Sequence, residues 1–262
     1  MPSRKLLLKM SKIKVFSASY NSHRFCVNCA ESVSRQTLLP AEHFYIDDCS
    51  TDDTHRWMNE ISSAISKKYP LTMAMNQGIN GRKYKLLNLY EYILKCDDDD
   101  IICVLDGDDW LATDDALEKI SDAYSDPAIR YAYTNWKYSH NNELGISKKI
   151  PGVNWNPYTN PWITSAMSTF RAIEFRNIPF ENFLRWDYKW FTMGCDQAYV
   201  LPILWKIRQE TGTYESVKFI DEPLYVYQFT ENPNKPRNNN DGGMRMDAHN
   251  SVTFIKNRGY IR

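Results

Sequence analysis

The stretch DIICVLDGDDWL, residues 100–111, decides the fold class. Its centre, IICVL at 101–105, contains no polar residue, whereas a strand with one face in water alternates apolar and polar side chains. A continuous apolar run is typical of a strand that is buried on both faces of a parallel sheet. The acidic sequence DGDD follows directly at 106–109. We therefore expect a buried central strand that ends in a group of carboxylates.

Strands and helices alternate on both sides of this stretch. We expect strands at 12–19, 42–47, 71–76, 100–106 and 129–136, and helices at 21–36, 50–69, 81–95 and 113–124. This alternation predicts an α/β fold with a Rossmann-like, mostly parallel central sheet and helices on both faces.

The second half of the chain has a different composition. Residues 150–191 are rich in aromatic residues, Pro and Asn, and a helix is expected at 196–212, where Pro202 would kink it or delay its start. A strand at 219–229 and a turn-rich segment at 232–243 follow, and the last residues are weakly helical. No internal repeat is visible, so a single domain is expected.

Composition excludes several classes of protein. The chain has 262 residues and is 43% hydrophobic, which is enough for a sizeable core. Lys+Arg and Asp+Glu are both 32, so the net charge of zero gives no reason to expect binding to nucleic acid or to an acidic membrane. No apolar run could span a bilayer, and the basic start has only three consecutive leucines. We expect a cytoplasmic protein without a transmembrane segment, and the oligomeric state stays open.

Cys26 and Cys29 form a single CxxC pair among six cysteines. With Ala30 and Val33 they fall at positions i, i+3, i+4 and i+7, on one face of a helix. Without a second CxxC, packing in the core is favoured over a redox or zinc site.

The D-x-D spacing of Asp106 and Asp108 suits a divalent cation. In open α/β sheets, ligands bind beyond the carboxyl ends of the strands, which is where this sequence lies. Two carboxylates at about 4 Å repel each other by roughly 4 kcal/mol at an effective dielectric constant near 20. Mn²⁺ or Mg²⁺, shared with a diphosphate, would offset that cost. Gly107 is expected to let the backbone turn, and DDDD at 97–100 should lie at the opposite end of the strand as a turn or a helix cap.

Several motifs in the same order resemble the nucleotide-binding motifs of family 2 glycosyltransferases. They are SASYN (17–21), YIDDCSTDDT (45–54), NQGINGRKY (76–84) and VLDGDDWL (104–111), and DQAYVLPIL (196–204) and EPLYVYQF (222–229) are similar to later signatures. The resemblance covers roughly residues 12–230 and implies the GT-A fold. It divides the domain into a nucleotide-binding half (12–136), an acceptor-binding half (137–230) and a C-terminal tail (231–262).

The resemblance also implies roles for individual residues. Nucleotide-sugar binding would fall to Ala18, Ser19, Tyr20, Asp48, Arg82, Asp106 and Gly107, with Asp108 as the metal ligand. Asp48 would accept a hydrogen bond from the base, usually uracil. An Asx turn before the helix is the alternative role for Asp47 and Asp48, and it is favoured for Asp47. Arg82 would lie near the diphosphate, with Lys83 and Lys85 as alternatives.

Asp196 matches the catalytic base of the family, which deprotonates the acceptor hydroxyl in an inverting transfer. Because it opens a helix, an N-cap is the alternative role. The family often has Glu-Asp here, whereas this chain has Cys195 before Asp196, and the segment after the last signature is altered to QFTEN. His249 is a further candidate metal ligand, although a histidine in a polar tail is more often simply exposed.

The expected function is metal-dependent transfer of a sugar from a nucleoside diphosphate, most often UDP, to a hydroxyl of a glycan or other acceptor, with inversion. Of Trp155, Trp162, Trp186 and Trp190, one or two should touch a ligand. The alternatives are a nucleotidyltransferase, disfavoured because the first strand ends without a glycine-rich loop, and a non-catalytic binding module, disfavoured because Asp108 and Asp196 are both present.

Overall fold

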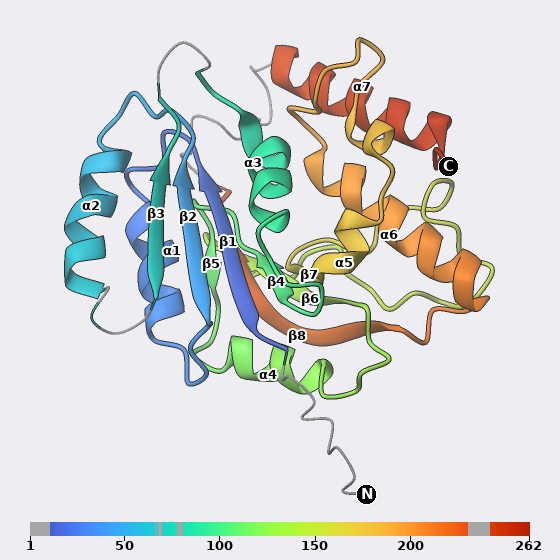
Figure 1. The fold of residues 1–262 in the computed structure, drawn as a ribbon, viewed down its shortest axis with the longest axis horizontal. Helices are drawn as coiled ribbons and strands as arrows, with labels where there is room; N and C mark the ends of the chain where they lie inside the picture. Colours follow the sequence, from blue (N-terminus) through green and yellow to red (C-terminus); the bar gives the residue numbers. More distant parts are fainter. Residues whose placement is uncertain (1–10, 66, 68–69, 78–80, 230–241) are drawn as a thin grey trace, which may run out of the picture.

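A computed structural model describes residues 11–65, 67, 70–77, 81–229 and 242–262. The strands are β1 Ile13–Ser19, β2 Glu42–Asp47, β3 Leu71–Met75, β4 Ile101–Val104, β5 Trp110–Leu111, β6 Tyr131–Tyr138, β7 Ser168–Arg171 and β8 Val217–Tyr227. Within the described chain they form an eight-stranded sheet in the order β3-β2-β1-β4-β7-β6-β8-β5. Figure 1 shows how this sheet curves through the molecule.

Six strands point the same way. β1 pairs in parallel with β2 and β4, and β2 with β3. β7 is antiparallel to both β4 and β6, so β6 regains the direction of β4, and β8 is parallel to β6. The expected mostly parallel sheet is confirmed. The reversed strands β7 and β5 were not expected, because they have only four and two residues and carry no clear alternation.

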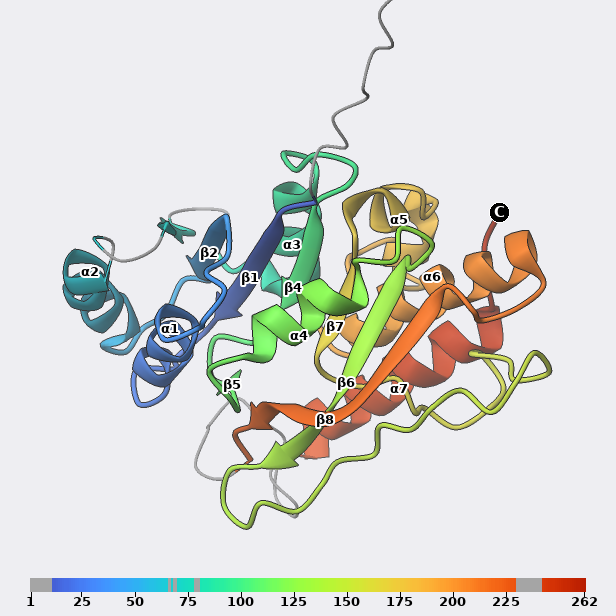
Figure 2. The ribbon, with the colours of Figure 1, turned by 90° about the horizontal axis from the view of Figure 1, so that it is seen from below.

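Helices cover both faces of the sheet (Figure 2). They are α1 Cys26–Ser34, α2 Thr54–Ile65, α3 Tyr84–Ile93, α4 Ala116–Ala123, α5 Ala172–Arg176, α6 Cys195–Thr211 and α7 Gly242–Arg258, with a 3-10 turn, η1, at Phe180–Phe183. Ile102 and Val104 of β4 pack in a core with α3, α5 and α6, whereas Ile101, Cys103 and Leu105 pack in a second core with α1, α2 and α4. Residues 101–105 are apolar throughout because consecutive side chains enter opposite cores.

Three smaller expectations were also tested. Cys26 and Cys29 are free and fully buried on α1, so core packing is confirmed, and burial raises the pKa of the Cys26 thiol to about 12. Asp100 precedes β4 and its carboxylate lies 2.8 Å from the Lys14 ammonium, so the 97–100 run lies at the far end of the strand, as expected. α6 runs from Cys195 through Pro202, so the late start considered for this helix is wrong.

The C-terminal segment is helical as expected, in α7, while most of the turn-rich 232–243 and QFTEN segments, and residues 78–80 of the NQGINGRKY motif, lie outside the described residues. No helix in the described parts of the chain is long and apolar enough to cross a membrane.

Candidate active site

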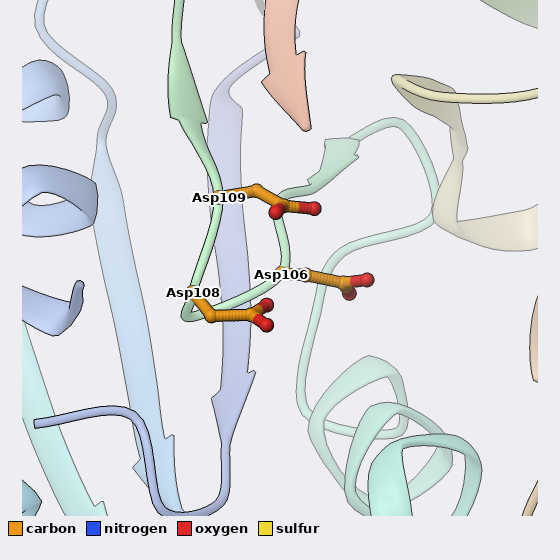
Figure 3. A group of neighbouring side chains, drawn as sticks. All are labelled: Asp106, Asp108 and Asp109. Carbon is orange, nitrogen blue, oxygen red and sulfur yellow. The ribbon is translucent and has the colours of Figure 1, made fainter. Parts of the chain in front are cut away.

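The loop between β4 and β5 carries Asp106, Asp108 and Asp109 (Figure 3). One oxygen of each carboxylate lies within 4.8 Å of the others. The three side chains point to the same side of the loop, as Figure 3 shows. Burial, together with the nearby Asp196 and Asp108, raises the pKa of Asp106, although the Lys85 ammonium works against this rise. A cation at this position would relieve the repulsion, so the residues present fit a divalent metal with oxygen ligands. His249 is exposed on α7 and is not part of this cluster.

Asp109 is fully buried and ties the loop to β8. Its Oδ2 accepts a hydrogen bond from the Tyr225 hydroxyl, and its Oδ1 accepts one from the backbone N–H of Gln228. Burial and the Asp109 charge raise the pKa of Tyr225 well above its usual range, so the phenol stays a donor. Asp109 therefore anchors the loop, and Asp106 and Asp108 are better placed to bind a cation.

The backbone turns at Gly107 as expected, but without a positive φ, so glycine is required there by a close approach to β1. A Cβ at this position would lie 2.5 Å from the Ser19 Cβ and 2.8 Å from the Tyr45 hydroxyl. The Gly107 N–H donates to the Ala18 carbonyl at 3.0 Å, and the Tyr45 hydroxyl donates to the Gly107 carbonyl at 3.1 Å. The loop is thus bonded directly to the end of β1, next to the residues expected to contact the base.

Gly107→Ala is expected to destabilise the fold by about 1–3 kcal/mol, the usual cost of overpacking, and to weaken UDP binding by displacing Asp106 and Asp108. Gly212→Ala is the control, because its added Cβ meets nothing within 4 Å and only its φ of +71° is strained. Thermal melts and UDP titrations of both variants test the claim. A wild-type melting curve and intact UDP binding in Gly107→Ala would contradict it.

Asp48 lies at the end of β2 and is almost fully buried. Its Oδ1 accepts hydrogen bonds from the Asn76 and Asn88 amides and from the N–H of Lys83, and its Oδ2 accepts from the N–H of Tyr84 at 2.8 Å. The Arg82 Nε is the most distant donor, 3.4 Å from Oδ2. Asp48 therefore fixes the chain that enters α3. A base could bond to Asp48 most readily by replacing Arg82, so its contact with the base stays a prediction.

Arg82 stacks on Tyr20, with its guanidinium carbon 3.6 Å from the ring centroid, and lies 4.6 Å from the centroid of the Tyr84 ring. Asp47, next to Asp48, accepts from the N–H of Ser50, three residues on, whereas an Asx turn bonds the N–H two residues on, so the Asx turn stays a prediction. The structure therefore brings Tyr20, Asp48 and Arg82 together at the carboxyl edge of β1 and β2. A role for Arg82 at the diphosphate remains a prediction.

Asp48→Ala is expected to weaken UDP binding by roughly 1–3 kcal/mol and also to destabilise the fold, because the Asn88 amide and the N–H groups that begin α3 lose a charged acceptor. Calorimetry with UDP, paired with a melting curve, separates the two effects. If stability falls while UDP affinity is unchanged, Asp48 holds the chain but does not contact the base.

Lys85 connects the two halves of the site. Its ammonium lies 2.6 Å from Asp106 Oδ1 and 2.7 Å from Asp196 Oδ1. Burial lowers the pKa of Lys85, but the two carboxylates outweigh it and raise that pKa well above its usual range. Lys83, the other alternative to Arg82, instead pairs with Glu91 at 2.8 Å. Lys85 therefore stays charged between the donor-side and acceptor-side carboxylates.

Asp196 is the second residue of α6 and follows the N-cap residue Gly194, so the N-cap alternative is wrong. Its Oδ1 also accepts a hydrogen bond from the Tyr199 hydroxyl, one turn along the helix, at 3.1 Å. The side chain is half exposed, at 52%. Lys85 and Tyr199 both contact Oδ1, so the half-exposed carboxylate is held in place by two contacts to one of its oxygens.

Lys85→Met is expected to tighten the binding of Mn²⁺ alone by about two- to tenfold, because it removes a positive charge beside Asp106. Sugar transfer should nevertheless fall, since Asp196 loses a contact that orients it. Lys83→Met is the matched control, because the Lys83 ammonium pairs with Glu91 of α3. This variant should change neither the affinity for Mn²⁺ nor the rate of transfer. Weaker Mn²⁺ binding in Lys85→Met would contradict the role of this ammonium as a competitor of the cation.

A cavity of about 310 Å³ opens beside these carboxylates. Asp106, Lys85 and Asp196 line it together with Trp162 and other aromatic residues. Of the other three tryptophans singled out from the sequence, Trp155 is buried in the core, Trp190 packs on Tyr90, and Trp186 lies against Phe254. Among the four, only Trp162 lines the cavity.

Sequence reasoning did not find the contacts of Tyr199, Tyr225 and Asn88, and it ranked Lys85 below Arg82. One signal for Lys85 was available: it precedes Asn88 and Leu89 by three and four residues, so it shares the buried face of α3. Tyr199 and Tyr225 carried no such signal. Both lie in apolar segments of the sequence and are buried, so they could not be told apart from ordinary core residues.

The fold and the carboxylate loop define the class of the protein, a GT-A fold with an acidic site at the carboxyl edge of its sheet. The family described as Glycosyl transferase family 2 matches residues 15–179, more than half of the chain, and the chain belongs to this family of transferases. Chondroitin synthase of Escherichia coli is 29% identical over 162 residues, which are 62% of this chain and 22% of that protein. The chain thus spans about a fifth of the length of this curated relative.

Solved structures share the fold. S. aureus TarS 1–349 in complex with UDP-GlcNAc has a TM-score of 0.58 and 16% identity, over 84% of this chain and 59% of that one. Glucosyl-3-phosphoglycerate synthase from Mycobacterium tuberculosis, in complex with Mn²⁺, UDP and glucosyl-3-phosphoglycerate, has a TM-score of 0.59 and 13% identity, over 94% of this chain and 80% of that one.

Proposed function

We propose that the protein transfers a sugar from a nucleoside diphosphate, most often UDP, to a hydroxyl of a glycan or other acceptor. The observation that carries the proposal is the arrangement around one cavity, where the Lys85 ammonium contacts both Asp106 and Asp196. A donor held at the β4–β5 loop would present its sugar to the carboxylate that the acceptor must approach.

The residues of this chain would share the work as follows. Asp108 and Asp106 would hold Mn²⁺ or Mg²⁺, whose charge would stabilise the departing diphosphate. Tyr20, Asp48 and Arg82 would hold the nucleotide, with the backbone of Ala18 and Ser19 along the base. Complexes of fold relatives with UDP and Mn²⁺ support this choice of ligands.

Asp196 would act as the base. Its carboxylate accepts the proton of the acceptor hydroxyl while that oxygen forms a bond to the anomeric carbon. The bond from this carbon to the diphosphate oxygen breaks, and the electron pair leaves with the nucleoside diphosphate. Attack from the side opposite the leaving group inverts the anomeric centre.

A thermal-shift experiment with UDP and Mn²⁺, each alone and together, tests the donor site. Stabilisation by the pair beyond either ligand alone is expected, because a ligand that binds only the native state raises its melting temperature. GDP with Mn²⁺ tests the preference for the nucleobase, uracil or guanine. A mannosyltransferase of Pyrobaculum calidifontis with this fold was solved with GDP-Man and Mn²⁺. No shift with any nucleotide–metal pair would overturn the proposal.

A further inference from the structure

One wall of the cavity is built from aromatic side chains that the donor site does not use. Trp136 and Tyr138 come from β6, Tyr227 from the end of β8, and Phe229 from the chain just beyond it. The Trp136 ring lies 5.3 Å from that of Tyr227, and the Tyr138 ring 5.4 Å from that of Phe229. We call these four residues the aromatic wall. β6 and β8 are paired neighbours in the sheet, so the backbone that carries the aromatic wall is held by strand pairing.

Three of the four residues of the aromatic wall are more exposed than the core beneath them, whereas the fourth, Trp136, is buried. Tyr131 and Tyr133, on the same strand β6, are 0% and 1% exposed, whereas Tyr138, Tyr227 and Phe229 are only partly buried. Trp162 also lines the cavity and is partly buried. Aromatic surface that stays partly exposed inside a cavity is typical of a ligand site, and a volume of about 310 Å³ is at the small end of such sites, about 300–1,000 Å³.

Gly145 fixes the plane of the wall at Trp136. A Cβ on this glycine would lie 1.9–2.4 Å from the atoms of the indole ring, so only glycine allows the backbone to pack on that ring. The Gly145 N–H also donates to the Trp136 carbonyl at 2.7 Å. The backbone at Gly145 packs against the indole of Trp136 and restricts its rotation. This part of the aromatic wall is therefore formed before a ligand binds.

Charge restricts what the cavity accepts. Its charged lining residues are Lys85, Asp106 and Asp196, which give one positive and two negative charges. Lys85 already contacts both carboxylates, so it is engaged and does not present a free positive charge to a ligand. Because the three groups together carry a net negative charge, a carboxylate on a ligand would be repelled, whereas the flat C–H face of an uncharged pyranose would pack on the rings without that repulsion.

We propose that the aromatic wall, with Trp162, is an acceptor subsite for the uncharged terminal pyranose of a glycan, and that it turns a hydroxyl of that sugar toward Asp196. This inference rests on the proposed function, which supplies the role of Asp196. It adds the chemical class of the acceptor: a neutral sugar end is bound, and an end that carries a uronate is rejected.

Saturation-transfer NMR on the full chain with UDP and Mg²⁺ tests the subsite. The neutral probes are methyl β-D-glucopyranoside and the methyl glycosides of galactose and N-acetylglucosamine. The charged probe is methyl β-D-glucopyranosiduronate, in which a carboxylate replaces the C6 hydroxymethyl group of methyl β-D-glucopyranoside. We expect saturation of at least one neutral glycoside, and binding of the uronate at least fivefold weaker than that of methyl glucopyranoside. Trp162→Leu and Tyr227→Leu, which keep apolar bulk but remove the ring, should lower the neutral signal at least fivefold.

Trp186→Leu is the matched control, because this indole is half exposed and packs on Phe254 outside the cavity. Calorimetry with UDP and Mg²⁺ on the same samples judges the donor site independently. If UDP binds but no neutral glycoside does, if the Trp162 and Tyr227 variants bind as well as the wild type, or if the uronate binds as tightly as the glucoside, the subsite is overturned. If UDP itself fails to bind, the proposed function falls, and glycoside binding still decides whether the wall is a sugar site.

Discussion

Asp196→Asn is expected to lower the rate of sugar transfer by about 10²–10⁴-fold, the typical contribution of a positioned general base. The amide keeps the shape of the side chain, and its oxygen can still accept from Lys85 and Tyr199. It cannot take the proton of an acceptor hydroxyl. Since Asp196 is not the N-cap of α6, and its side chain is half exposed, the change in stability should stay below about 1 kcal/mol.

The measurement is the transfer rate at saturating donor, with a melting curve and a titration of UDP and Mn²⁺ on the same variant. The donor is first identified by screening slow hydrolysis of UDP-, GDP- and TDP-sugars. Asp187→Asn is the control, because Asp187 pairs with Arg185 and does not line the cavity. A variant Asp196→Asn that transfers at nearly the wild-type rate would remove Asp196 from the role of base.

Asp108→Asn should abolish the response to Mn²⁺ and lower transfer by about 10²–10³-fold, the usual loss when a group that stabilises the developing charge is removed. The asparagine side chain is nearly the same size, so the fold should persist, but it lacks the negative charge that attracts the cation. Unlike Asp196→Asn, this variant should also lose the joint binding of UDP and Mn²⁺. The two variants together therefore distinguish loss of donor binding from loss of the catalytic base.

Asp99→Asn serves as the control for charge, because Asp99 is exposed in the acidic run at the other end of β4. Calorimetry with Mn²⁺, with and without UDP, is the measurement. Wild-type metal affinity in Asp108→Asn would assign the cation to other ligands, and Asp106 would then be the next residue to test.

Local patterns sufficed for much of the fold. The apolar run at 101–105 indicated a strand buried on both faces, and β4 does divide its side chains between two cores. The helices α1 to α4 lie within the expected ranges because apolar periodicity reports which face of a helix is buried. β7 escaped prediction because its insertion between β4 and β6 depends on partners far apart in the chain.

The sequence by itself determined the alternation of strands and helices, and it put the carboxylates of 106–109 at the carboxyl end of a central strand. Those features follow from side-chain periodicity and from short-range chain geometry. Only the tertiary structure decided that Gly107 is needed for close approach to β1, that Lys85 joins Asp106 to Asp196, and that Tyr138 and Tyr227 face the same cavity. Each of these depends on a contact between distant segments, and such contacts are set when the helices and strands pack, because no local pattern encodes the distance between them.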